Sequence, residues 1–268
     1  MSVLDEILAT KRDEVTVLHQ PETREAIRRA ALAAAPPRDF LGALRHRARE
    51  EETLGVIAEI KRRSPSKGEL APDLDAARVA ATYAAGGATC LSVLTDGPFF
   101  GGSLDDLRAA VGRTAVPVLR KDFILDELQI VEARAGGAAA VLLIVRALSG
   151  SRLTELLACA GEAGLEALVE VHTPDEVARA LDAGATVLGV NSRDLDTFTV
   201  DTASAWTMLR AVPSRCVAVA ESGMASVADV EAAAAAGADA VLIGTALSSA
   251  AEPDDLLGRL SAVTRRGR

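Results

Sequence analysis

Short runs of apolar residues recur along the chain between about residue 55 and residue 245, and most of them follow a helical stretch that ends in glycine. In one example, Ala85-Gly86-Gly87-Ala88 precedes the run Cys90–Leu94. Glycine just past a helix adopts the left-handed conformation that ends it, and a run that is apolar at every position is typical of a strand buried on both faces. The pattern predicts eight strands: Val56–Ile60, Thr89–Leu94, Val116–Arg120, Ala139–Val145, Glu166–Val171, Val187–Val190, Val217–Ala220 and Ala240–Ile243.

Helical patterns separate these runs, and several of them have clear starts. Thr173 precedes Pro174 and two acidic residues, which is the pattern of a capped first turn, and Ser103 and Ser226 are expected to cap two further helices. Strands that alternate with helices through right-handed crossovers form a parallel sheet. Eight such units in about 210 residues predict an α/β fold, a closed (β/α)₈ TIM barrel. A doubly wound sheet would need fewer strands, and no G-x-G-x-x-G follows the first run.

Residues 1–50 precede the predicted barrel. Apolar residues from Val3 to Leu18 fall on one helical face, and a second helix is expected from Glu22 to Ala34, before Pro36-Pro37. We expect this N-terminal helical extension to cap the barrel or to border its mouth. We therefore expect one domain over residues 1–268, with the extension at 1–50 and the barrel at 55–265.

Composition and charge exclude several classes of protein. The chain has 268 residues, 49% of them hydrophobic, and a net charge of −9, which disfavours binding to nucleic acid or to an anionic membrane. The basic runs Arg45–Arg49 and Arg265–Arg268 are interpreted as solvated or frayed surface. Three scattered cysteines and no apolar run of about 20 residues predict a cytoplasmic protein without disulfides or membrane spans. We expect a monomer.

Charged and polar residues stand where the predicted strands end. The carboxyl ends of TIM-barrel strands form the active-site face, so these side chains should converge. Glu59 and Lys61 are two residues apart and should point to the same side of their strand. Any one such residue is equally well explained as a structural ion pair, but the convergence indicates general acid and base chemistry. The candidates are Glu59, Lys61, Lys121, Glu170, Asn191, Arg193, Glu221 and Ser222.

The remaining candidates have weaker signals. Gly223, Gly244 and Thr245 follow the last two strands, where barrels commonly bind phosphate, although glycine there is also an ordinary turn residue. Phe99 and Phe100 suit either loop packing or an apolar wall for an aromatic substrate. His172 is interpreted as a supporting or capping residue. No spacing typical of metal ligands occurs, so no metal is expected.

Several of these segments match one enzyme family in order along nearly the whole chain. The K-R-x-S-P-S and L-R-K-D-F strings are the most specific, and Arg63 is a minor departure because lysine is common there. The chain resembles indole-3-glycerol phosphate synthase at Ile57–Ser66, Leu94–Ser103, Leu119–Ile124, Leu168–His172, Gly189–Leu195 and Glu221–Gly223.

The resemblance implies a carboxy-lyase of tryptophan biosynthesis that needs no cofactor. Its phosphorylated substrate would be 1-(o-carboxyphenylamino)-1-deoxyribulose 5-phosphate, which loses carbon dioxide and water as the pyrrole ring closes. By analogy Lys121 is the general acid, Lys61 holds the carboxylate and Glu170 assists dehydration. Glu59 orients the lysines and Asn191 positions hydroxyl groups. The other implied contacts are Arg193, Glu221 and Ser222 in support, Phe100 and Phe123 on the substrate, and Ser64, Gly223, Gly244 and Thr245 at the phosphate.

Two alternatives stay open on the sequence alone. A sugar-phosphate isomerase barrel would share the phosphate end but should carry an Asp or Cys pair at its strand ends, where this chain has Glu59 and Lys61. A barrel that binds a phosphorylated metabolite without turnover should lack at least one of the strand-end charges. Binding without turnover would identify it.

Overall fold

Eight parallel strands close into a barrel in the computed structural model, which describes residues 2–267 apart from the side chain of Arg49. Neighbouring strands around the barrel follow one another in sequence, and the last pairs with the first. All eight predicted strands are confirmed, with ends that differ by at most two residues. Their bounds are β1 Gly55–Ile60, β4 Cys90–Leu94, β5 Val118–Lys121, β6 Ala140–Ile144, β7 Glu166–Val171, β8 Val187–Asn191, β9 Val217–Glu221 and β10 Ala240–Ile243.

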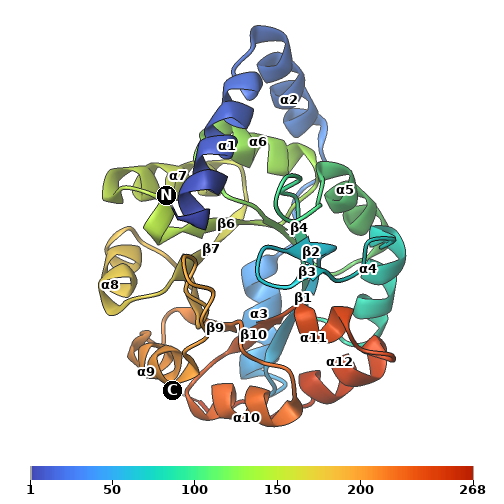
Figure 1. Cartoon of the computed structure of the whole chain (residues 1–268), viewed down its shortest axis with the longest axis vertical. Helices are drawn as coiled ribbons and strands as arrows, with labels where there is room; N and C mark the ends of the chain where they lie inside the picture. Colours follow the sequence, from blue (N-terminus) through green and yellow to red (C-terminus); the bar gives the residue numbers. More distant parts are fainter. Residues whose placement is uncertain (1, 268) are drawn as a thin grey trace.

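The helices that follow the strands form a ring around the barrel (Figure 1). Thr173, Ser103 and Ser226 each accept a backbone hydrogen bond at a helix start, as predicted. Within residues 2–267, none of the helices is long and apolar enough to span a bilayer. The helices that follow β1, together with a 3₁₀ turn, are α4 Ala76–Ala85, α5 Leu104–Arg113, α6 Glu127–Ala135, η1 Val145–Ala147, α7 Gly150–Glu162, α8 Pro174–Asp182, α9 Thr202–Ala211, α10 Val227–Ala235, α11 Thr245–Ser248 and α12 Pro253–Ser261.

The barrel wall separates two buried apolar clusters. Val56 and Ala58 pack outward against the helices, whereas Ile57, Leu119 and Leu168 fill the barrel interior. Successive side chains of a strand point to opposite faces, so the inward series continues two residues further along each strand. This alternation places charged residues at the carboxyl-terminal mouth: Glu59 after Ile57, Lys121 after Leu119 and Glu170 after Leu168.

The N-terminal extension contributes to both ends of the barrel. The two predicted helices are present as α1 (Val3–Leu18) and α2 (Pro21–Ala33), and α2 projects beyond the ring (Figure 1). A third helix, α3 (Phe40–Arg49), was not predicted. Its Phe40 and Leu44 are fully buried in the interior cluster beside Ala240 at the amino-terminal end of β10, so α3 plugs the end opposite the mouth.

A buried lysine fastens α1 beside the mouth. The side chain of Lys11 is 2% exposed, and its Nζ lies 3.1 Å from Oδ2 of Asp96 and 2.9 Å from Oδ1 of Asp122. Asp96 follows β4, and Asp122 directly follows Lys121 at the end of β5. Burial alone would lower the pKa of Lys11, but Asp122, Glu14 and Asp96 outweigh burial and raise it. Helix α1 of the extension therefore borders the mouth, which is one of the two positions expected from the sequence.

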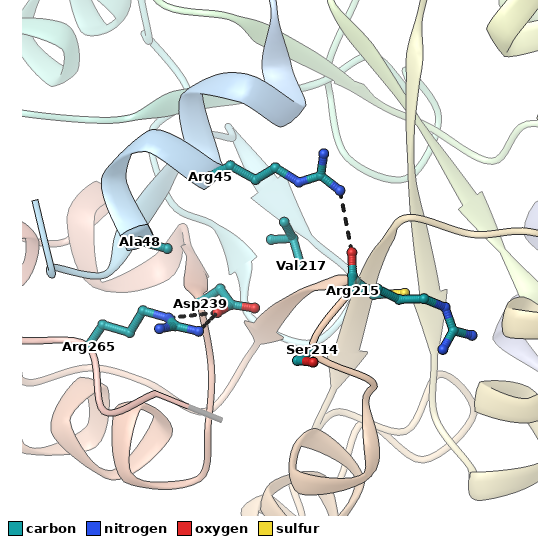
Figure 2. A pocket seen from close by; sticks show the side chains of 8 residues that line it. Arg45, Ala48, Ser214, Arg215, Val217, Asp239 and Arg265 are labelled. Carbon is teal, nitrogen blue, oxygen red and sulfur yellow. Dashed lines mark hydrogen bonds and ion pairs between the residues drawn. The ribbon is translucent and has the colours of Figure 1, made fainter. Parts of the chain in front are cut away.

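Two basic residues from the runs interpreted as surface, Arg45 and Arg265, are held in place near the amino-terminal strand ends, whereas Arg266 is exposed as interpreted. Arg265 pairs with the buried Asp239, with Nη2 2.6 Å from Oδ1, and Arg45 of α3 donates to the carbonyl of Arg215 (Figure 2). These side chains line a cavity of about 300 Å³. The interpretation of the tail is thus wrong for Arg265, while Arg268 lies outside the described residues. The cavity is at the end of the barrel opposite the charged mouth.

Candidate active site

Lys121 stands at the centre of the mouth, between two glutamates from different strands. Its Nζ lies 2.8 Å from Oε2 of Glu170 at the end of β7 and 3.1 Å from Oε2 of Glu221 at the end of β9. Both glutamate side chains are 2% exposed. Burial would lower the pKa of Lys121, but the charges of Glu170, Glu221 and Glu59 outweigh burial and raise it. Lys121 therefore carries its proton at neutral pH.

The two glutamates beside Lys121 differ in their affinity for a proton. Burial would raise the pKa of Glu170, but Lys121, His172 and Asn191 lower it to about 2. For Glu221, burial and the nearby charge of Glu170 outweigh Lys121 and raise the pKa to about 7. One cation cannot neutralise two buried carboxylates, so one of them takes up a proton far more easily than the other. The site thus combines an ionised carboxylate, an ammonium group and a carboxyl that titrates near neutrality.

Glu59 and Lys61 form a second ion pair at the end of β1. Nζ of Lys61 lies 2.5 Å from Oε1 of Glu59, so the two side chains lie on the same side of the strand, as their spacing predicted. A Cβ atom on Gly244 would overlap that same carboxylate, and one on Gly189 would overlap the carboxylate of Glu221. Each glycine lies at the end of, or within, a strand that neighbours the strand of the glutamate, and its lack of a side chain makes room for that carboxylate.

Further polar residues lie at the ends of β8 and β9, next to the ion pairs of Lys121. Asn191, at the end of β8, is 9% exposed, and its Oδ1 accepts a hydrogen bond from the backbone N–H of Arg193 at 3.0 Å. The guanidinium of Arg193 donates to the carbonyl of Phe198, so it braces its own loop. Ser222 has a positive φ of 64°, a strained conformation for a residue with a side chain. Such strain is common where a site positions a backbone group.

The expected phosphate residues come from three adjacent strands. Gly223 follows β9, Gly244 and Thr245 follow β10, and Ser64 follows β1, which pairs with β10. Ser64 lies in a hairpin of two short strands, β2 (Arg63–Ser64) and β3 (Gly68–Glu69), which the sequence did not predict. Its hydroxyl is 3.4 Å from that of Ser66. The structure therefore places all four residues on one side of the mouth.

An aromatic pair lies on another side of the mouth. The ring centroids of Phe100 and Phe123 are 6.1 Å apart, and the rings are tilted by 38°. Asp96 accepts hydrogen bonds from the backbone N–H groups of Phe99 and Phe100, which holds their loop in place. The apolar cluster beneath them includes Leu4, Ile7 and Leu8 of α1. Phe100 thus packs within the loop and also belongs to an apolar wall, so both readings of it fit.

Sequence reasoning missed the residues that support this site from outside the strands. Lys11, Asp96 and Asp122 form the anchor of α1, for which the signal in the sequence is a lysine on the apolar face of a helix. His172 lies 3.4 Å from both Glu170 and Glu176, so it supports the site as interpreted. Among the described residues, no group of three or more His, Cys, Asp or Glu side chains is arranged to hold a metal ion.

Solved structures of low sequence identity share the fold. A tryptophan synthase chain from M. tuberculosis superposes with a TM-score of 0.64 at 19% identity, covering 87% of this chain and 100% of that one. A 3-hexulose-6-phosphate synthase from Salmonella typhimurium gives a TM-score of 0.62 at 18% identity, covering 78% and 97%. At such identities the likeness shows the barrel architecture alone.

Sequence relatives are much closer. An indole-3-glycerol phosphate synthase from Kineococcus radiotolerans is 48% identical over 94% of this chain and 92% of its own length. One from Mycobacterium ulcerans is 47% identical over 94% and 91%. The sequence model of indole-3-glycerol phosphate synthase matches residues 4–260, which includes α1 and every strand of the barrel. The chain therefore belongs to the indole-3-glycerol phosphate synthase family.

Proposed function

We propose that this chain converts 1-(o-carboxyphenylamino)-1-deoxyribulose 5-phosphate into indole-3-glycerol phosphate, with Lys121 as the general acid. The observation that carries the proposal is the position of Lys121 between Glu170 and Glu221, where it is held protonated at the mouth of the barrel. Carbonyl activation requires a proton donor beside the ketone oxygen, and a buried ammonium supplies both the proton and a positive charge.

Ring closure follows from this arrangement. The aromatic carbon that bears the carboxylate attacks the ketone, and Lys121 gives its proton to the developing alkoxide as the carbon–carbon bond forms. The bond to the carboxylate then breaks, and its electron pair restores the aromatic ring as carbon dioxide leaves. Because the substrate ring itself receives these electrons, the step needs no separate electron sink. Glu170, which is ionised before this step, takes a proton from the carbon between the nitrogen and the alcohol carbon and passes it to the hydroxyl, which leaves as water as the carbon–carbon double bond forms.

Lys61 is placed to hold the substrate carboxylate before it is lost. Glu59 fixes the ammonium of Lys61 at 2.5 Å and also contributes to the charge that keeps Lys121 protonated. The rings of Phe100 and Phe123 offer an apolar face for the aromatic ring of the substrate. Asn191 positions substrate hydroxyls, while Glu221, Ser222 and Arg193 support the surrounding loops.

The phosphate would lie on the side of the mouth formed by β9, β10 and β1. Ser64 offers a hydroxyl, and Gly223, Gly244 and Thr245 offer backbone N–H groups with little side chain to block a ligand. Backbone donors of this kind suit a phosphate group, and barrels often bind one after their last two strands. The substrate would then extend from the phosphate across the mouth to the aromatic pair.

We also propose that the protein acts as a cytoplasmic monomer that binds no nucleic acid. The net charge of −9 supports the absence of nucleic acid, and three cysteines scattered along the sequence, two of them buried, suit a reducing compartment. Multi-angle light scattering during gel filtration tests the oligomeric state, and a dimer mass would contradict it.

Turnover with metal-free substrate and buffer, in the presence of a chelator, tests the proposed function. Indole absorbance reports the product. We expect turnover by the parent and by Lys67→Ala, whose lysine is exposed, and loss of turnover in Lys121→Ala and Lys121→Arg. The arginine variant keeps a cation between the two glutamates but holds its proton too tightly to donate it. Folded parent protein that binds the substrate without turnover would instead identify a binding barrel.

A further inference from the structure

His172 is a buried histidine enclosed by two carboxylates. Its side chain is 3% exposed and lies just past the end of β7, two residues after Glu170. Nε2 is 3.4 Å from Oε1 of Glu170, and Nδ1 is 3.4 Å from Oε2 of Glu176 in α8. Neither ring nitrogen makes a hydrogen bond of good geometry among the described residues, so each carboxylate acts on the ring through its charge at 3.4 Å.

The groups that face the ring favour the charged imidazolium. The carboxylates are Glu170 on β7 and Glu176 on α8, and the opposing cation is Arg146 on η1, whose Nε is 3.4 Å from Glu176. Arg146 also pairs with Asp194 in the loop after β8, with Nη1 3.2 Å from Oδ2, so part of its positive charge is balanced there. Burial would lower the pKa of His172, but Glu176 and Glu170 outweigh both burial and Arg146 and raise it.

Glu170 is thereby held at both of its oxygens. Oε2 faces the ammonium of Lys121 at 2.8 Å, and Oε1 faces the ring of His172 at 3.4 Å. Two cations on opposite oxygens fix the plane of the carboxylate and disfavour its protonation. Without His172, Glu170 would face only the charge of Lys121, and it would share that charge with Glu221, whose Oε2 lies 3.1 Å from Nζ of Lys121.

We propose that His172 is a positioning residue that stays protonated between Glu170 and Glu176 and holds Glu170 ionised and turned toward Lys121. The effect of His172 on turnover rests on the proposed role of Glu170 in the reaction. The charge on His172 does not depend on that role, so it is tested separately.

Nitrogen-15 NMR of histidine-labelled protein measures that charge directly. The chain has three histidines, and the other two, His19 and His46, are at least half exposed. We expect one ring to carry protons on both nitrogens at about pH 7, and its signals to vanish in His172→Gln. In Glu176→Gln the same ring should lose one of these protons at a lower pH than in the parent, because Glu176 helps to raise the pKa of His172. A His172 ring that is neutral at about pH 7 would overturn the proposal.

Steady-state kinetics measure the effect on Glu170. In His172→Gln we expect kcat to fall severalfold more at about pH 5.5 than at about pH 8, because Glu170 then competes for a proton, while KM changes by less than about twofold. His46→Gln, in α3 at the far end of the barrel, serves as the matched control and should behave as the parent. An equal loss of kcat at every pH would indicate a purely structural role and would overturn the proposal.

The two readouts separate the two proposals. If the folded parent has no turnover, the proposed function fails, and the NMR titration alone decides whether His172 is a buried cation. If the parent turns over and His172 titrates as a neutral ring, the proposed function stands and the role given to His172 is wrong.

Discussion

A Cβ atom on Gly244 would lie 3.0 Å from Cδ of Glu59 and closer still to its Oε1. The carboxylate that pairs with Lys61 therefore occupies the space that any other residue at 244 would need. We expect Gly244→Ala to displace Glu59 and to lower kcat by at least about tenfold, since small misplacements at a catalytic site are costly. Gly161→Ala is the control. A Cβ atom at this position of α7 would meet nothing within 4 Å, so the variant should keep full activity in the same assay.

The anchor of α1 has a predictable effect on stability. Lys11→Met leaves Asp96 and Asp122 buried with less positive charge around them, and removing one partner from a buried ion pair typically costs about 3–5 kcal/mol. We expect a loss of that order in the free energy of unfolding, measured by urea denaturation. Lys67→Met changes an exposed lysine and should be nearly neutral. Equal stability of the two variants would show that Lys11 does not fasten the helix.

Glu221 makes the stability of the fold depend on pH near neutrality. Burial raises its pKa to about 7, so between the ordinary glutamate value and about pH 7 the folded chain binds a proton that the unfolded chain lacks. Stability from this group is present at lower pH and is lost as the pH rises through about 7. Glu221→Gln removes the effect.

We expect the free energy of unfolding of Glu221→Gln, relative to that of the parent, to increase as the pH rises from about 5 to about 8, because only the parent loses the stability that depends on a protonated Glu221. Urea titrations at several pH values measure this difference. Glu162→Gln, at an exposed position in α7, should run parallel to the parent. Parallel curves for Glu221→Gln as well would place the titration near neutrality on another group.

The aromatic pair should affect substrate binding more than chemistry. Phe100→Ala removes one ring of a pair that faces the mouth, and we expect KM to rise roughly tenfold with a smaller change in kcat, the equivalent of about 1.4 kcal/mol of binding. Phe100→Leu keeps apolar surface, so its KM should lie between those of the parent and of Phe100→Ala. A drop in kcat without a change in KM would argue that the ring shapes the loop and does not contact substrate.

The strands and the converging charges were predictable because each depends on local pattern. Strands buried on both faces are apolar throughout, and the two-residue spacing of Glu59 and Lys61 fixes their common side wherever the strand lies. Helix α3 was not predicted, because it is short and rich in basic residues, and the pattern does not indicate that its Phe40 and Leu44 close the end of the barrel.

Pairings between distant segments were also beyond the sequence. Lys11 meets Asp96 and Asp122 only because α1 lies across the ends of β4 and β5, and no local pattern states where a terminal helix packs. The contrast between Glu170 and Glu221 has a similar origin. Both are glutamates at strand ends, and what separates their affinities for a proton is the position of His172 and Lys121 around them.

The end of β5 carries two charged residues side by side, Lys121 facing the barrel interior and Asp122 receiving Lys11 from α1. Because neighbours on a strand point to opposite sides, one stretch of backbone stands between the reacting acid and the fastening of the extension. The fastening of the extension and the charge of Lys121 are thus set by different side chains: Asp96 and Asp122 hold Lys11, whereas Glu170, Glu221 and Glu59 surround Lys121.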